Sequence, residues 1–282
     1  MKPKILSHEE VMSMLPDRDP WAHKGDFGRI LLLCGSKGYT GAAYLAAMGA
    51  LRTGAGLVFL GVPESIYTVE AVKLNEAIVF PLPEEDGMLS TAALPDILRR
   101  LSHIDAVLIG CGLGQSEEVR EVVQSVLLYA NCPVVLDADG INLIAPHKDI
   151  LRGRAFPTIL TPHDGEFLRL GGSLGKERMA AAAAFAEEWN CVLLLKGHET
   201  CVSDGSVHYR NHTGNPGMAV GGSGDLLAGM IVSLVGQGIV PTEAAACAAW
   251  LHGAAGDLAA RKLGQYAMLP TDMLDFLPRL LK

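Results

Sequence analysis

Short apolar runs that alternate with helix-like segments are the feature that most limits what this chain can fold into. The runs are continuous and end at glycine or polar residues, which is typical of buried parallel strands. They are residues 30–34, 57–60, 77–80, 106–109 and 133–136, separated by helical patterns at 42–52, 92–101 and 117–129. Such alternation requires right-handed crossovers and helices on both faces of a sheet. The sequence therefore predicts a three-layer α/β fold with a central, mostly parallel sheet.

Further elements fit the same architecture. Ser7 and Glu10 have the spacing of a capping box, which predicts a short helix ending at Met14. A strand is expected at 192–195, and alanine-rich covering helices at 180–189 and 242–263. Because no repeat, charge block or low-complexity linker divides the chain, we expect residues 1–282 to form a single domain.

Composition narrows the class of function. The chain has 282 residues, is 49% hydrophobic and carries a net charge of −8, so it offers no electrostatic footprint for nucleic acid or an anionic membrane. It has no signal-like N-terminus and no apolar run long enough for a bilayer. Its six cysteines are scattered without a CxxC pair, which indicates reduced core thiols, a cytoplasmic location and no structural metal site.

The glycine-rich stretch 211–229 contains the strongest candidate site. Apolar residues recur at helical spacing after Asp225, so the glycines end where a buried helix begins. Gly222, Ser223 and Gly224 are predicted to present bare N–H groups to a phosphate, as an anion hole. An acid beside such a cradle favours proton abstraction from an attacking hydroxyl, although an N-capping aspartate is the structural alternative. Neither the Walker A nor the GxGxxG pattern matches.

Glycines and polar residues occupy five loops at the edge where the strands are expected to end. They are residues 35–36, 110–114, 137–139, 161–166 and 196–200. Strand-to-helix turns favour Gly and Asp on conformational grounds alone. Since the carboxyl ends of parallel strands share one sheet edge, we nevertheless expect these loops to form one pocket.

Individual side chains in these loops have two interpretations each. His163 is either a helix cap or a catalytic group. Glu166 is a candidate for Mg²⁺, directly or through water. Asp137 and Asp139 are either paired acids or turn caps. Lys196 either contacts phosphate or extends to solvent.

Taken together, these loops resemble the ADP/ATP-dependent NAD(P)H-hydrate dehydratases of the ribokinase-like superfamily. The resemblance covers the chain from about Lys24 to the C-terminus. Its most specific motifs are GYTGAAYLAAMGALRTGAGLV, IGCGLG, DADGINLI, LTPHDGE, LLKGHET and GNPGMAVGGSGDLLAG. The resemblance implies a ribokinase-like fold and repair of the S form of hydrated NADH or NADPH, with ADP or ATP as co-substrate and Mg²⁺.

The family's site residues carry over to matching positions. Those implied at the hydrated cofactor are Ala42, Gly112, Gly114, His163 and Asp225, and those at the adenine nucleotide are Lys196, Gly197, His198, Glu199, Thr200 and Gly224. Cys111 departs from the family, which usually has proline there. By the same analogy we expect a tetramer. No fused epimerase domain is recognised, so a separate protein is expected to supply epimerisation.

The chemistry implied at Asp225 is phosphoryl transfer followed by elimination. Asp225 would take the proton of the ring hydroxyl, the phosphoryl group would be transferred to that oxygen, and the ring nitrogen would then expel phosphate. Two alternatives remain. One is a ribokinase-like small-molecule kinase that releases a stable phosphate ester, and the other is a non-catalytic adenine-nucleotide sensor. The sequence does not decide between ADP and ATP or between NADH and NADPH hydrates.

Overall fold

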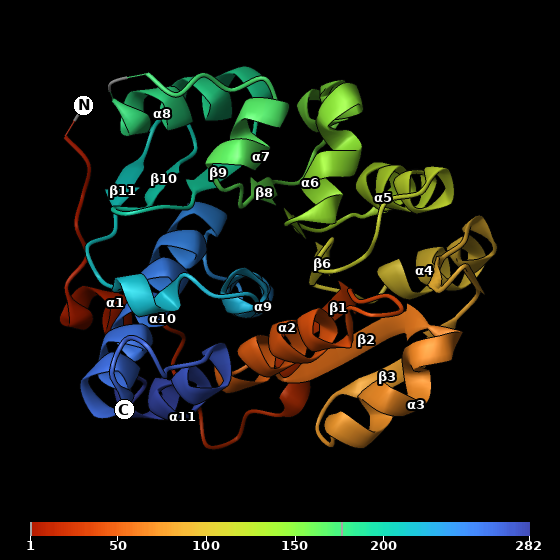
Figure 1. Ribbon diagram of the computed structural model, residues 1–282, viewed down its shortest axis with the longest axis horizontal. Coiled ribbons are helices and arrows are strands. Elements are labelled where there is room, and N and C mark those ends of the chain that lie inside the picture. The colour runs from red at the N-terminus through yellow and green to blue at the C-terminus, as the bar shows by residue number, and fades with distance from the viewer. Residues whose placement is uncertain (1, 176) are drawn as a thin grey trace.

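The computed structural model describes residues 2–175 and 177–282, and a nine-stranded sheet runs through it (Figure 1). The strand order is β11-β10-β9-β8-β7-β6-β1-β2-β3. The strands are β1 Arg29–Leu33, β2 Leu57–Pro63, β3 Ile78–Leu82, β6 Ala106–Ile109, β7 Val134–Leu136, β8 Thr158–Leu160, β9 Val192–Leu195, β10 Cys201–Ser203 and β11 His208–Arg210. All pairs from β9 to β3 are parallel, whereas β10 is antiparallel to both neighbours. The predicted mostly parallel sheet is confirmed.

Helices cover both faces of this sheet (Figure 1). One layer holds α1 His8–Met14, α2 Thr40–Arg52, α3 Glu64–Lys73, α9 Ser223–Gly236, α10 Pro241–Leu263 and α11 Pro270–Leu280. The other holds α4 Leu94–Leu101, α5 Glu117–Tyr129, α6 Asp139–Ile144, α7 Asp164–Arg169 and α8 Arg178–Trp189. Short 3-10 helices are η1 Lys24–Phe27, η2 Thr91–Ala93, η3 Ala145–Gly153 and η4 Pro216–Met218. The three-layer prediction is thus confirmed.

Strand β1 shows why the apolar runs are continuous. Ile30 and Leu32 belong to the core on the α2 and α9 side, whereas Leu31 and Leu33 belong to the core on the α4 and α5 side. Successive side chains of a strand point to opposite faces, so a strand covered on both sides needs apolar residues at every position. The single sheet with a core on each face supports the proposal that residues 1–282 form one domain.

Some helices and strands of the structure were not predicted from the sequence. Helix α3 exposes Val69 and Val72, so its apolar residues do not mark one buried stripe. Strands β10 and β11 have three residues each, which is too short for a readable alternation. A small hairpin, β4 Glu84–Glu85 and β5 Met88–Leu89, stands apart from the main sheet.

Helices α2 and α9 approach so closely that their backbones touch. A Cβ atom added at Gly229 would lie 2.0 Å from the carbonyl oxygen of Ala46, and one at Gly49 would lie 2.5 Å from that of Leu226. Only glycine allows contacts this short, so the small residues of both helices set the separation of their axes. This packing fixes the N-terminal end of α9 relative to the sheet.

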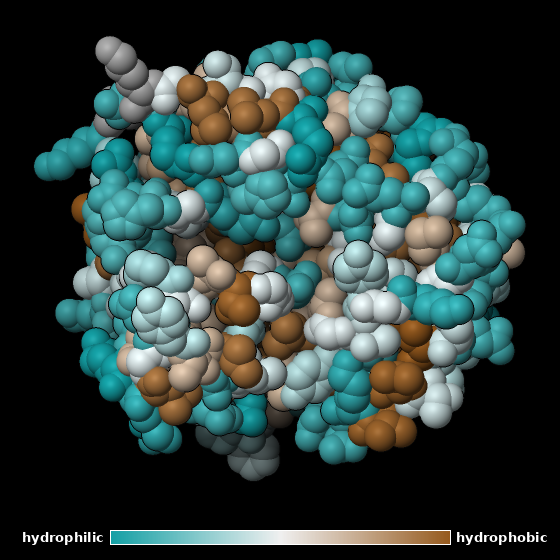
Figure 2. Space-filling model, in the orientation of Figure 1, coloured by the Kyte–Doolittle hydropathy of each residue, from teal (hydrophilic) through white to brown (hydrophobic). Residues whose placement is uncertain are grey.

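The sheet changes winding direction at β1. Chain connections lead from β1 to β2 on one side and return to β6 on the other. Ligands of open α/β sheets bind at such a switch point, beyond the carboxyl ends of the strands. In Figure 1, α9 is seen nearly end-on close to this point, and Figure 2 shows a depression in the surface there. Within the described residues, no helix is long and apolar enough to cross a membrane.

Candidate active site

A buried ion pair lies where β7, β8 and β9 end. Lys196 Nζ is 2.8 Å from Asp137 Oδ1, and Thr161 donates its hydroxyl to the same oxygen over 2.8 Å. Burial would raise the pKa of Asp137, but the charge and hydrogen bond of Lys196 and the hydrogen bond of Thr161 outweigh it, so this pKa is lowered. Burial would lower the pKa of Lys196, yet the charges of Asp137 and Glu166 raise it. The pair is therefore charged at neutral pH.

Asp225 faces this pair from the first turn of α9. Ligand atoms of Asp225, Asp137 and Cys111 all lie within 4.8 Å of one another. Burial, followed by the charge of Asp137, raises the pKa of Asp225 to about 6. A carboxylate with this pKa is ionised at neutral pH and is basic enough to accept a proton in a general-base step.

The N-terminus of α9 supplies amide donors beside Asp225. The expectation for Ser223 was wrong, because its N–H donates to the carbonyl of Val220 over 3.3 Å. Among residues 2–175 and 177–282, no hydrogen-bond partner is recorded for the N–H groups of Gly224 and Asp225. A Cβ added at Gly224 would lie 3.3 Å from Lys196 Nζ, so this glycine keeps the ammonium and the amide donors adjacent. These N–H groups and the Lys196 ammonium are the donors beside the carboxylates that suit a phosphate group.

The glycine loop after β6 packs against the start of α2. A Cβ at Gly112 would lie 2.8 Å from that of Ala42, so these two predicted substrate contacts are neighbours. Gly112 has a φ of 60° and Gly114 a φ of 82°, a region that favours glycine. The N–H of Gly114 donates to Asp139 Oδ2 over 2.9 Å. Asp139 therefore shapes the loop, and of these two aspartates it is Asp137 that pairs with Lys196.

His163 caps α7, as the structural alternative predicted. Its Nδ1 accepts the N–H of Gly165 over 3.0 Å, while Glu166 Oε2 accepts the N–H of His163 over 2.8 Å. The imidazole is half-exposed, and its Nε2 lies 3.5 Å from Glu166 Oε1. Buried Glu166 lies 3.9 Å from Lys196 Nζ through the same Oε2, so each of its carboxylate oxygens has a neighbouring side-chain nitrogen.

The residues after Lys196 differ in whether their side chains are available at the sheet edge. Gly197 and His198 are exposed at the sheet edge, and Thr200 donates its hydroxyl to the carbonyl of Gly197 over 3.1 Å. Glu199 turns away, because its carboxylate pairs with Arg210 at 3.5 Å and with His212 at 3.3 Å. Of the predicted nucleotide residues, Lys196 therefore contacts Asp137 and Gly224, whereas the Glu199 side chain does not.

Two supporting residues were not found from the sequence. Asp257 on α10 accepts hydrogen bonds from the N–H of Gly214 and the side chain of Asn215, each over 3.0 Å. His252, also on α10, lies 3.3 Å from the hydroxyl of Ser223, and burial lowers its pKa to about 4. Both residues stand in an alanine-rich helix whose pattern indicates only packing, so no sequence signal marked them.

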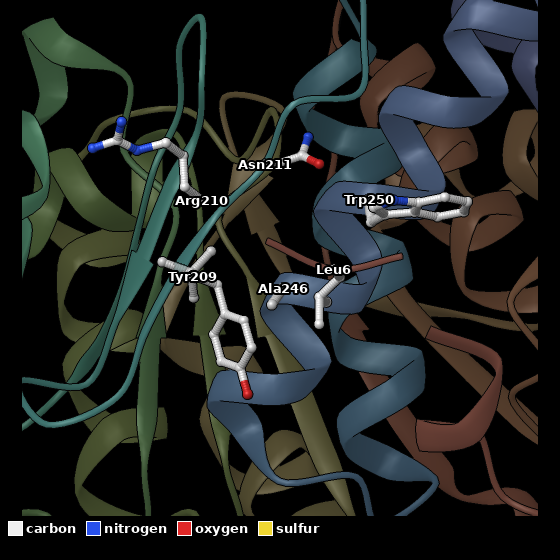
Figure 3. Close-up of a pocket in the computed structure, with 7 residues that line it drawn as sticks. Leu6, Tyr209, Arg210, Asn211, Ala246 and Trp250 are labelled. Carbon is white, nitrogen blue, oxygen red and sulfur yellow. The ribbon is translucent and has the colours of Figure 1, made fainter. Parts of the chain in front are cut away.

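Two recorded cavities lie away from this edge. The one in Figure 3 is between β11 and α10, lined by residues that include Leu6, Tyr209 and Trp250, and its volume of about 10 Å³ is too small for a metabolite. The other, of about 300 Å³, lies at the opposite ends of β1 and β2, beside Arg29 and Leu57. Neither of these two cavities is lined by a residue of the candidate site.

Comparison with known proteins gives a consistent result. The family model described as NAD(P)H-hydrate dehydratase matches residues 30–279. The bifunctional NAD(P)H-hydrate repair enzyme of Moorella thermoacetica is 46% identical over 99% of this chain and 54% of that protein. The ADP-dependent (S)-NAD(P)H-hydrate dehydratase of Bacillus subtilis is 37% identical over 100% of this chain and 99% of that protein. The chain thus spans about half the length of the bifunctional relatives it matches.

Solved structures agree with these matches. The ADP/ATP-dependent NAD(P)H-hydrate dehydratase of Bacillus subtilis, co-crystallised with ATP and Mg²⁺, has a TM-score of 0.82 and 34% identity over 99% of this chain and 98% of that one. A ribokinase-like superfamily protein of Enterococcus faecalis has a TM-score of 0.87 and 26% identity over 99% and 95%. The ribokinase-like fold expected from the sequence is confirmed.

Proposed function

Because the chain belongs to the NAD(P)H-hydrate dehydratase family, we propose that it restores the S form of hydrated NADH or NADPH in a reaction driven by an adenine nucleotide. The observation that carries this proposal is the position of Asp225. Its carboxylate, with a pKa of about 6, stands in the first turn of α9 beside amide donors without recorded partners. A base next to an anion cradle suits activation of a hydroxyl toward a phosphoryl group.

The proposed reaction has two stages. Asp225 takes the proton of the ring hydroxyl while that oxygen attacks the terminal phosphoryl group, which yields a phosphate ester and the shorter nucleotide. The lone pair of the ring nitrogen then expels phosphate, and loss of a proton from the neighbouring ring carbon restores the double bond. Phosphate leaves far more readily than hydroxide, so phosphorylation of the hydroxyl lowers the barrier to elimination.

Phosphate is proposed to lie between Lys196 and the N–H groups of Gly224 and Asp225. Ala42, Gly112, Gly114 and His163 would contact the hydrated cofactor, and residues 197–200 the adenine nucleotide. Glu199 is retained only for backbone contacts, because its carboxylate is paired with Arg210 and His212. The Glu166 carboxylate, whose Oε1 lies 3.5 Å from His163 Nε2, would hold Mg²⁺ directly or through water, and the ion would neutralise phosphate charge when bound.

The rival activity is a small-molecule kinase that releases its phosphate ester. The site would serve both reactions, so product analysis separates them. With hydrated NADH, Mg²⁺ and ADP or ATP, we expect one orthophosphate for each molecule of NADH restored. The restored NADH is measured by its absorbance. Accumulation of a phosphorylated product would establish the kinase instead. Nucleotide binding without any turnover would establish the sensor.

Asp225→Asn tests the assigned base directly. The variant should bind nucleotide as the wild type does and lose turnover by 10²-fold or more, the order expected for a general base. Asp164→Asn is the matched control, because this acid is exposed at the same sheet edge and pairs with Arg178. Near wild-type turnover in Asp225→Asn would reject the mechanism.

Three further expectations accompany the activity. We propose a cytoplasmic location, because all six cysteines are free and buried, as reduced thiols are. A homo-oligomer, a tetramer by analogy with the family, remains a prediction that light scattering can test. Cooperation with a separate epimerase is likewise a prediction, supported by the bifunctional relatives that pair two repair activities in one protein.

A further inference from the structure

The buried thiol of Cys111 lies against the carboxylates of the candidate active site. Cys111, directly after β6, is fully buried, and its Sγ lies 3.7 Å from Asp137 Oδ2. Cys34, directly after β1, is also fully buried and lies near Cys111. The backbones meet as well, because the N–H of Gly35 donates to the carbonyl of Cys111 over 2.8 Å. Sulfur is therefore within reach of the groups that the proposed reaction uses.

The carboxylates carry more negative charge than nearby cations balance. Lys196 pairs with Asp137, but no ion pair to Asp225 is recorded in the part of the chain that the structure describes. Asp137 and Asp139 both act on Asp225 as like charges. A cation placed between Asp137 and Asp225 would relieve this repulsion.

The donor set determines which cation fits best. Mg²⁺ prefers oxygen ligands and keeps several waters, whereas thiolate sulfur selects softer ions of the zinc type. Zinc binds sulfur and carboxylate oxygen at about 2.0–2.3 Å. Donor atoms of Cys111, Asp137 and Asp225 that already lie within 4.8 Å of one another need only modest side-chain rotation to converge on one ion.

We propose that Cys111, Asp137 and Asp225 form a site for a thiophilic divalent cation such as Zn²⁺. Binding converts the Cys111 thiol to thiolate and releases its proton to solvent, so the affinity rises with pH. The occupied site ties up the Asp225 carboxylate and blocks the hydroxyl-activating step. Metal binding stands independently of the proposed function, whereas inhibition rests on it.

The binding test uses Cd²⁺, a spectroscopic substitute for Zn²⁺, with the full chain in a Mg²⁺-free buffer containing a non-thiol reductant. We expect a cadmium–thiolate charge-transfer band that saturates at one ion per chain. Cys111→Ser retains side-chain size and should lower the affinity at least tenfold, since even second-shell changes cost 10–100-fold. Cys191→Ala is the matched control, because this buried thiol has no ionisable neighbour that affects its pKa, and it should leave the band unchanged.

The inhibition test follows turnover of the hydrate with excess Mg²⁺ while Zn²⁺ is added. Wild type should be inhibited competitively with the hydrate, and Cys111→Ser should need at least tenfold more Zn²⁺. Absence of the band in wild type, or an unchanged band in a Cys111→Ser protein that melts like wild type, overturns the metal site. A normal band in a protein that shows no hydrate turnover leaves the site standing and rejects the proposed function.

Discussion

Lys196 Nζ lies 2.8 Å from Asp137 Oδ1, so the loops after β9 and β7 are joined by a buried ion pair across the end of β8. Removing one partner of such a pair leaves an uncompensated charge in the interior. We therefore expect Lys196→Met to lower the free energy of unfolding by about 3–5 kcal/mol. The double variant Asp137→Asn with Lys196→Met should be more stable than Lys196→Met alone. Urea denaturation of both variants measures this difference, and equal stabilities would contradict it.

The pH profile of the proposed reaction should report Asp225. Since its pKa is about 6, kcat/KM should rise with pH up to about 6 and then level off. The charge of Asp137 contributes to this raised pKa, so Asp137→Asn should move the acidic limb to lower pH. A pH–rate profile of each protein checks the shift. An acidic limb unchanged in Asp137→Asn would show that another group controls the rate.

Asp225→Asn should also stabilise the fold. The pKa of Asp225 is raised in the folded state, so the folded protein holds the proton more tightly than the unfolded chain does. Stability is then lost as pH rises from about 4, the unfolded value, to about 6, the folded value. At pH 7 we expect Asp225→Asn to gain up to about 3 kcal/mol, and to gain nothing near pH 4. Thermal melts at both pH values measure the effect, and a gain that does not vary with pH would contradict its electrostatic cause.

His252 should make the protein sensitive to mild acid. Its pKa is lowered to about 4 in the folded state, so the unfolded chain binds its proton first as pH falls. Stability is fully present above about 6.5, the unfolded value, and is lost between about 6.5 and about 4. His252→Gln should show a smaller loss over this range in pH-dependent denaturation. Equal losses in both proteins would assign the acid sensitivity to other groups.

The contact between α2 and α9 should not tolerate one added methyl group. Gly229→Ala would place its Cβ 2.0 Å from the carbonyl oxygen of Ala46, so we expect a loss of about 1–3 kcal/mol. Gly221→Ala is the control, because an added Cβ there meets no atom within 4 Å. Denaturant midpoints of both variants make the comparison. Comparable midpoints would mean that α9 shifts without cost.

The sequence predicted the fold well because strands covered by helices on both faces appear as continuous runs of apolar residues. Strand β1 and helix α5 lie close to their predicted positions, since each contributes residues to a fully enclosed core. Helix α3 and strands β10 and β11 were not predicted, because the helix exposes apolar residues and the strands are only three residues long. The pattern of apolar residues does not predict an element that is short or that lies at the edge of the sheet.

The sequence predicted which residues belong to the candidate site better than it predicted which contacts they make. Asp137 and Lys196 were candidates from their places after strands, yet only the sheet order reveals that they form a pair. Ser223 was expected to offer its N–H, whereas the turn at Val220 uses it. From the sequence, Cys111 was only a departure from the family. Its proximity to Cys34 could not be predicted, because the two residues lie far apart in the sequence.

Asp257 holds Gly214 and Asn215 to α10 through both of its carboxylate oxygens. The glycine-rich segment is thereby anchored at its beginning, and the first turn of α9 anchors its end. The peptide units between these two anchors are joined by backbone hydrogen bonds of their own, such as that from Ser223 to Val220. The position of Asp225 is therefore tied to α10 through a short segment that is held at both ends.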